Sequence, residues 1–113
     1  MTHVLYLAKY KTMDKVFKAL SDPTRRRVLE LLRKRPLTAG ELAENFKIAK
    51  PTLSAHLATL KEADLIEAER QSTIIIYRLK LSVLEDALLA FADTVGVGIP
   101  LTGLTKAAKG QKP

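Results

Sequence analysis

The sequence predicts a mainly helical domain with a small β-hairpin, in the element order α-α-α-α-β-β-α. Three observations predict it: two short helical patterns joined by a tight turn within 38–66, a β-branched run at 74–79, and amphipathic segments flanking both. The chain has 113 residues, 47% hydrophobic and 27% charged, which is typical of one globular domain with a modest core. Because so short a helical chain often shares part of its core with a second copy, we expect oligomerisation.

Composition excludes several classes of site. The chain has no cysteine, and therefore no disulfide, thiolate metal site or thiol catalysis. Its N-terminal apolar run, 4–8, is too short for a signal peptide or a membrane span, so we expect a cytoplasmic protein without a membrane partner. The net charge is +7, but 14 basic and 12 acidic residues lie within 13–95. A nucleic-acid surface must therefore come from local clustering of charge.

The two ends differ in composition from the predicted domain, 13–95. Segment 1–12 alternates apolar and basic residues, and three alternatives stay open: an arm packed on a partner subunit, a disordered leader, or an extension before the domain. Segment 96–113 is rich in Gly, Pro, Thr and Lys, which predicts a poorly ordered basic tail.

The first helix is predicted from Met13 to Leu20, with Thr12 as its N-cap and with Val16 and Phe17 on the same side as Leu20. Ser21, Asp22 and Pro23 end that helix and begin the next, because Asp is a good N-cap and Pro suits the first helical position.

The second helix, 23–34, is predicted to bury Val28, Leu29 and Leu32. Arginines at 25, 26 and 27 occupy its first turn, where the helix dipole favours anions. Phosphate contacts, ion pairs across a subunit interface, or a solvated face that tolerates the cost would each explain them.

The central motif begins with Thr38 and Glu41, which have the spacing of a capping box. The helix that follows is expected to span about nine residues, with Leu42, Ala43 and Phe46 on one side. A turn at 47–49 follows, in which Ile48 is expected to fill the space beneath. The next helix, 50–63, has Pro51 in its first turn, and its inward residues are predicted to be Leu53, Leu57 and Leu60.

The opposite face of helix 50–63 is polar, small and free of acids as far as Lys61. Hydroxyls, small apolar groups and basic side chains are what a helix in the major groove of DNA uses to read bases. The alternative is a solvated helix face, but such faces are usually rich in Glu and Lys. The predicted groove-facing residues are Lys50, Thr52, Ser54, Ala55, His56 and Thr59.

A hairpin follows, with strands at 66–70 and 74–79. Its turn, 71–73, lacks glycine, so a looser tip is expected. Ser82 and Glu85 then have the spacing of a second capping box, which predicts a last helix to about Val95. The apolar stripe of that helix is too wide for a core of this size, and we expect it to form the dimer interface with the first helix. The residues expected in this interface are Val16, Phe17, Leu20, Leu84, Leu88, Phe91 and Val95.

Helix, helix, helix-turn-helix, hairpin and helix in this order make a winged helix-turn-helix. At residue level the chain resembles the ArsR/SmtB family of small bacterial and archaeal repressors, in VFKALSDPTRRRVLELL at 16–32, LTAGELAENFKIAKPTLSAHLATLKEADLI at 37–66 and IIYRL at 75–79. The DPTRRRVLELL block with a later S-x-H-L-x-x-L is specific for the family. AKPTLSAHL with TAGELAE is most similar to its SdpR-type autorepressor group.

The resemblance implies a homodimer that binds a double-stranded DNA operator and represses by blocking polymerase. Its first and last helices would form the interface, and its two recognition helices would enter successive major grooves. An unidentified protein or small-molecule effector is compatible with it. The DNA-binding residues that it implies are Thr38, Ala39, Lys50, Thr52, Ser54, Ala55, His56, Thr59 and, in the wing, Arg70.

Three departures from the family pattern matter. Ala49 stands where many relatives have a capping serine, and Gln71 and Ser72 make the wing less cationic. The positioning helix has no thiol and the last helix no histidine, and the histidines of the chain are His3 and His56. We therefore expect no metal site, no cofactor and no metal response.

Two other classes compete with a DNA-binding repressor. A winged-helix module for protein association is compatible with the nearly neutral domain and the weak wing. An enzyme is disfavoured, because no nucleophile lies beside a plausible base, no glycine-rich phosphate loop is present, and His56 has no acid within one helical turn. We therefore expect no catalytic residues.

Overall fold

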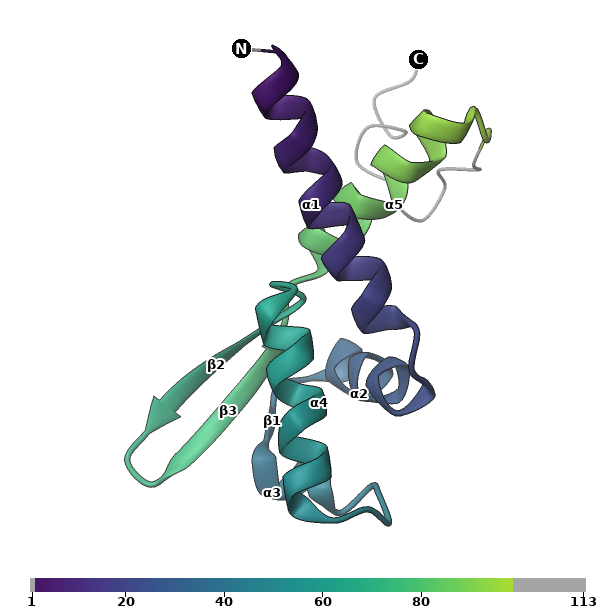
Figure 1. Cartoon of the computed structure of the whole chain (residues 1–113). Coiled ribbons are helices and arrows are strands. Elements are labelled where there is room, and N and C mark those ends of the chain that lie inside the picture. The colour runs from purple at the N-terminus through teal and green to yellow at the C-terminus, as the bar shows by residue number, and fades with distance from the viewer. Residues whose placement is uncertain (1, 99–113) are drawn as a thin grey trace, which may run out of the picture.

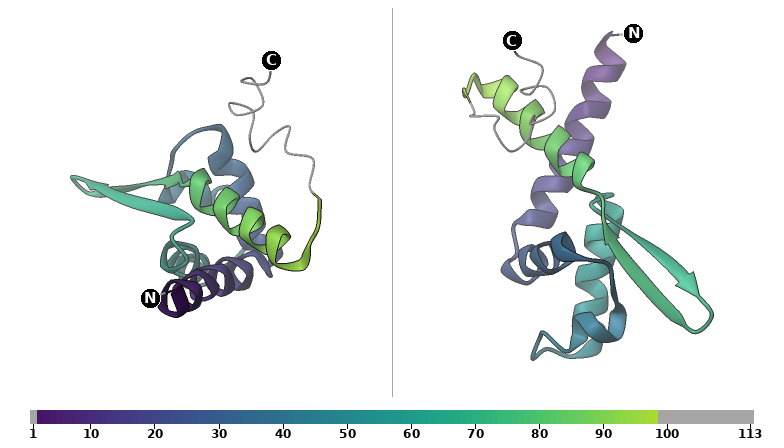
Figure 2. Two further views of the ribbon diagram at one scale, coloured as in Figure 1. Left: turned by 90° about the horizontal axis from the view of Figure 1, so that it is seen from above. Right: turned by 180° about the vertical axis from the view of Figure 1, so that it is seen from behind.

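The computed structural model describes residues 2–98, and the side chains of 11–98. Within them five helices and a three-stranded antiparallel sheet follow the predicted order, with one added strand (Figure 1). The elements are α1 (Thr2–Leu20), α2 (Pro23–Lys34), β1 (Leu37–Thr38), α3 (Ala39–Ala43), α4 (Lys50–Glu62), β2 (Ile66–Gln71), β3 (Ile74–Leu79) and α5 (Leu81–Val95). In both views of Figure 2, α1 and α5 lie side by side and the β2–β3 hairpin projects from the body. None of the described helices is long and apolar enough to cross a membrane.

Helix α1 is longer than predicted. It runs through Thr12 without a break, so the prediction that Thr12 caps a helix beginning at Met13 is wrong. No Pro or Gly occurs within 2–11, and nothing in that segment stops the helix. The backbone of 2–12 is helical and continuous with the predicted first helix. Most of the tail predicted at 96–113 lies outside the described residues.

The core lies where α1, α2, α3 and α4 meet the base of the sheet. The predicted inward residues of α2 and α4 are buried, which confirms their apolar periodicity. Helix α3 is shorter than the nine residues expected, because Asn45 and Phe46 donate to carbonyls three residues earlier and tighten the chain into a turn. Ile48 is 37% exposed, so it does not fill the space beneath that turn.

The N-terminus of α4 lacks a side-chain cap. Ala49 occupies the N-cap position in an extended conformation (φ −65°, ψ 146°), and no side chain there accepts a hydrogen bond from the first helical amides. A serine in this conformation could accept from the free amides of the first turn.

Ala49→Ser is therefore expected to raise the free energy of unfolding by about 1 kcal/mol. Urea denaturation followed by circular dichroism measures the change. Ala58→Ser is a matched control, since residue 58 is exposed within the same helix but not at its end. Because serine in a helix interior is about 0.5 kcal/mol less favourable than alanine, the control should lose stability. Equal effects of the two substitutions would contradict the capping argument.

The sheet has the order β1-β3-β2, and β1 was not predicted because two residues cannot display an alternating pattern. Leu37 lies opposite Tyr77, which fixes the start of α3 against the hairpin. Gln71 pairs with Ile74, so the hairpin closes through two residues, and the expectation of a looser tip is wrong. Ser72 adopts φ 60°, the left-handed conformation that glycine usually provides in such turns.

Helix α5 begins at Leu81, and Lys80 at its N-cap position makes no side-chain cap. The predicted Ser82–Glu85 capping box is therefore wrong. The Lys80 backbone N–H donates to the Leu65 carbonyl (2.8 Å) and its ammonium binds the Asp64 carboxylate (2.8 Å). These contacts hold Lys80 at the N-cap, two residues before the predicted Ser82. The predicted C-terminal end of α5 is confirmed, because the helix stops at Val95 and is followed by Gly96 at φ 76°.

Candidate nucleic-acid interface

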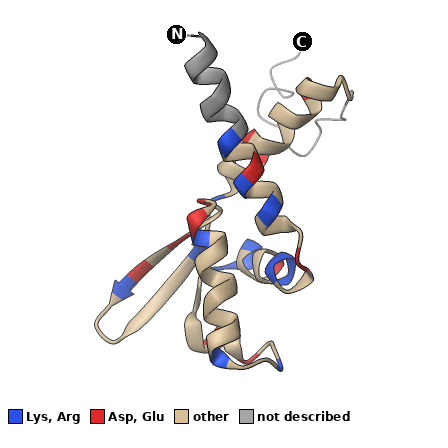
Figure 3. Ribbon diagram, viewed as in Figure 1, with Lys and Arg blue, Asp and Glu red and all other residues tan. Residues whose placement is uncertain are grey.

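Helix α4 presents an exposed polar face opposite its buried leucines. Lys50, Thr52, Ser54 and Ala55 are all exposed. Thr59 is half-buried, and its hydroxyl donates to the Ala55 carbonyl (3.1 Å). Figure 3 shows no acidic residue along most of this helix, with basic residues near both ends. A helix of this kind leaves its central surface open to a negatively charged groove.

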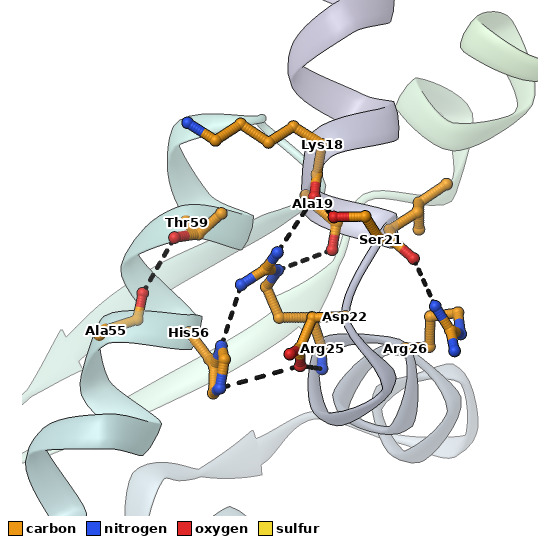
Figure 4. A network of polar contacts seen from close by, with 10 residues as sticks. Lys18, Ala19, Ser21, Asp22, Arg25, Arg26, Ala55, His56 and Thr59 are labelled. Atoms are coloured by element: carbon orange, nitrogen blue, oxygen red, sulfur yellow. Dashed lines mark hydrogen bonds and ion pairs between the residues drawn. The ribbon is translucent and has the colours of Figure 1, made fainter.

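His56 does not belong to that exposed face. Its side chain is 19% exposed, its Nδ1 lies 3.0 Å from the Arg25 guanidinium, and its Nε2 lies 3.8 Å from the Asp22 carboxylate (Figure 4). At 100° per residue, position 56 falls on the side of α4 that faces α2, whereas position 55 faces away. The expectation that His56 points at bases is therefore not met. The acid closest to the His56 ring is Asp22, at the start of α2. It lies far from His56 in the sequence, so a search within one helical turn of His56 could not find it.

Arg25 and Arg26 cap the C-terminus of α1. Arg25 donates to the carbonyls of Ala19 (2.7 Å) and Lys18 (3.1 Å), and Arg26 donates to the carbonyl of Leu20 (2.8 Å). The last carbonyls of a helix carry partial negative charge and lack intrahelical partners, so guanidinium groups are favourable there. This contact was not among the three predicted explanations, because it depends on the sharp turn between α1 and α2. The third arginine, Arg27, pairs with Glu30 of its own helix (2.8 Å).

Asp22 caps α2, as predicted, by accepting from the Arg25 backbone N–H (3.1 Å). Partial burial raises the pKa of Asp22, but the hydrogen bonds from the Arg25 and Thr24 backbone N–H groups, with the charge of Arg25, hold that pKa below its usual value. The carboxylate therefore stays ionised beside the imidazole.

The predicted capping box at the start of α3 is confirmed. The Thr38 N–H donates to Glu41 Oε1 (2.9 Å), and the Glu41 N–H donates to Thr38 Oγ1 (3.1 Å). The bond from the Thr38 N–H, with a smaller contribution from Arg35, lowers the pKa of Glu41. Ala39 shares the wall of a shallow hollow with Lys50 and Ser54. The structure thus brings the start of α3 next to the N-terminal half of α4.

The wing carries few cations. Glu69 pairs with Arg78 (3.3 Å) and accepts a hydrogen bond from Gln71 (3.2 Å). Arg70 is exposed near the tip, opposite Ile75, and among the described residues it forms no ion pair. Its positive charge is therefore available to a ligand near the tip of the hairpin.

The residues expected at a dimer interface divide into two groups. Val16 is fully buried inside the chain, and Leu20 and Leu84 pack against the same core. Phe17 and Leu88 are half-buried, whereas Phe91 is 45% and Val95 52% exposed. The Phe17 and Phe91 rings meet edge to face, with centroids 5.1 Å apart. The outer part of the predicted stripe thus stays uncovered, and Val16 presents no surface to a partner.

No group of three His, Asp or Glu side chains capable of holding a metal ion occurs among the residues that the structure describes. His56, the histidine within the described side chains, is already engaged by Arg25 and Asp22.

A helix-turn-helix beside a β-hairpin, with a second helix whose exposed face has no acid before its last residue, defines a DNA-binding transcriptional regulator of the winged helix-turn-helix class. The family model for bacterial regulatory proteins of the arsR family matches residues 22–68. The chain belongs to the arsR family, which confirms the family predicted from the sequence. This family consists of regulators, and the protein is not an enzyme.

Relatives with named functions agree with this. The transcriptional repressor SdpR of Bacillus subtilis is 49% identical over 76 residues, which cover 67% of this chain and 84% of SdpR. The arsenical resistance operon repressor of Staphylococcus xylosus is 34% identical over 76 residues, 67% of this chain and 73% of that repressor. An ArsR-like transcriptional regulator from Rhodococcus sp. RHA1 superposes with a TM-score of 0.70 at 27% identity, over 79% of this chain and 83% of that one.

Proposed function

We propose that this protein is a homodimeric transcriptional repressor that binds a pseudo-palindromic operator without sensing a metal. The observation that carries the proposal is the exposed face of α4, which has no acid before its last residue and lies opposite three buried leucines. SdpR and the arsenical operon protein are named repressors, which supports the same activity here.

In this proposal α4 lies in the major groove. Lys50, Thr52, Ser54 and Ala55 face bases or nearby phosphates, and Thr59 lies further along the groove. Thr38 and Ala39 place the start of α3 beside a phosphate, and Arg70 contacts the backbone beyond the wing. His56 supports the helix from behind, because its ring faces α2.

The dimer forms through α1 and α5. The exposed apolar side chains of Phe91 and Val95, with the half-buried Phe17 and Leu88, are the surface that a second copy would cover. A two-fold dimer places two copies of α4 in successive major grooves of a two-fold operator. The bound dimer then excludes polymerase from the promoter.

Sequencing of genomic fragments protected by the purified protein tests the proposal. We expect a two-fold symmetric site, in promoter DNA and including the promoter of its own gene, with half-sites about one helical turn apart. Because phosphate contacts release counterions, the operator affinity should fall steeply with salt, with a log-log slope of about −0.9 for each neutralised phosphate. If no DNA is retained at low salt, the protein is instead a winged-helix module for protein association. Zinc that changes operator affinity stoichiometrically would contradict the metal-free proposal.

Arg70→Ala is expected to weaken binding to every DNA sequence by a similar factor and to reduce the magnitude of the salt slope by about 1. The reason is that Arg70 lies near the tip of the wing and would reach phosphate rather than bases. Fluorescence anisotropy with the operator and with a scrambled duplex at several salt concentrations measures this. Arg78→Ala serves as a control, since Arg78 is already paired with Glu69. A loss confined to one operator variant would mean that Arg70 reads sequence.

A further inference from the structure

Arg25 lies where three helices meet. Its guanidinium donates through Nε to the Ala19 carbonyl (2.7 Å), through Nη2 to the Lys18 carbonyl (3.1 Å) and through Nη1 to His56 Nδ1 (3.0 Å). Arg25 belongs to the first turn of α2, and its side chain links the C-terminus of α1 to the middle of α4 (Figure 4). These bonds are directional, so they fix both the distance and the orientation between the groups that they join.

The contact also fixes the state of His56. An arginine remains protonated and can only donate, so Nδ1 must be the unprotonated acceptor. The ring proton is then on Nε2, on the side of the Asp22 carboxylate (3.8 Å). Asp22 in turn caps α2 through the Arg25 backbone N–H (3.1 Å). Arg25, His56 and Asp22 thus form a closed set of polar contacts between α2 and α4.

We infer that Arg25 and His56 are positioning residues that hold α4 at a fixed place against the C-terminus of α1, and thereby set the spacing between the two operator half-sites that the dimer accepts. The inference rests on the proposed function, because α1 belongs to the proposed dimer interface. If α1 is fixed to its partner and α4 is fixed to α1, the distance between the two copies of α4 is fixed as well. Neither residue needs to touch DNA.

The test measures binding to three duplexes: the operator found by fragment sequencing, and the same operator with one base pair added or removed between half-sites. The wild type should prefer the native spacing. Arg25→Lys keeps the positive charge but loses the planar guanidinium, which donates to α1 and α4 at once. This variant should bind the native operator about tenfold more weakly and lose most of the spacing preference. His56→Leu should behave similarly.

Two further variants separate positioning from folding. Arg26→Lys alters a second cap of α1 that does not touch α4, and it should keep the spacing preference. His56→Asn keeps an acceptor at the position of Nδ1 and should therefore also keep the spacing preference. The inference is overturned if Arg25→Lys or His56→Leu, folded by circular dichroism, discriminates spacing as the wild type does. Failure of the wild type to bind any operator would instead overturn the proposed function.

Discussion

Phe91→Glu is expected to give a folded monomer whose operator affinity is at least about 100-fold lower than that of the wild type. Phe91 is 45% exposed and meets Phe17 edge to face, so it belongs to the outer layer of α1 and α5 rather than to the core. A glutamate there remains solvated in the monomer, but it would place an unpaired charge inside the proposed dimer interface. Loss of the dimer removes the gain from linking two half-sites, which is commonly 10²–10⁴-fold in order of magnitude.

Sedimentation equilibrium and anisotropy with the operator measure the two parts of this prediction. Phe91→Leu is the matched control, because it keeps an apolar side chain and should keep both the dimer and the affinity. Circular dichroism must show the same helix content in both variants. A Phe91→Glu protein that remains dimeric would remove this part of α5 from the interface.

The helices were predictable from sequence where burial depends on local periodicity. Leu53, Leu57 and Leu60 repeat at helical spacing and are all buried. Thr38 and Glu41 form their capping box, which depends on two residues three positions apart in the chain. These predictions needed no knowledge of the rest of the molecule.

The failed predictions depend on contacts between distant parts of the chain. Ser82 and Glu85 have the same spacing as the first capping box but do not form one, because Lys80 is bound to the Leu65 carbonyl and to Asp64. The Arg25–His56 bond joins residues 31 positions apart. A helical pattern gives the side of α4 on which His56 lies, but not which helix covers that side. For this reason the sequence placed His56 on the DNA face and left the arginines of α2 unexplained.

Ala55→Glu is expected to lower operator affinity by about 100-fold or more while leaving the dimer and the fold intact. Residue 55 is exposed near the centre of α4, directly opposite the leucines that face the core. A carboxylate there would approach phosphates and the acceptor-rich edges of bases, and an unfavourable charge within an interface costs several kcal/mol. The hydrogen bond from Thr59 is to the Ala55 carbonyl, so the side-chain change does not remove it.

Ser82→Glu provides the charge control, since residue 82 is exposed in the first turn of α5 and the substitution lowers the net charge by the same amount. If affinity depended only on net charge, both variants would weaken binding equally. If α4 lies in the groove, Ala55→Glu should remove the footprint and Ser82→Glu should retain it. Ala55→Ser, which stays small and uncharged, should bind within a few-fold of the wild type, because a groove-facing position of this size accepts a hydroxyl but not an anion. Retention of the footprint by Ala55→Glu would mean that another surface of the protein reads the operator.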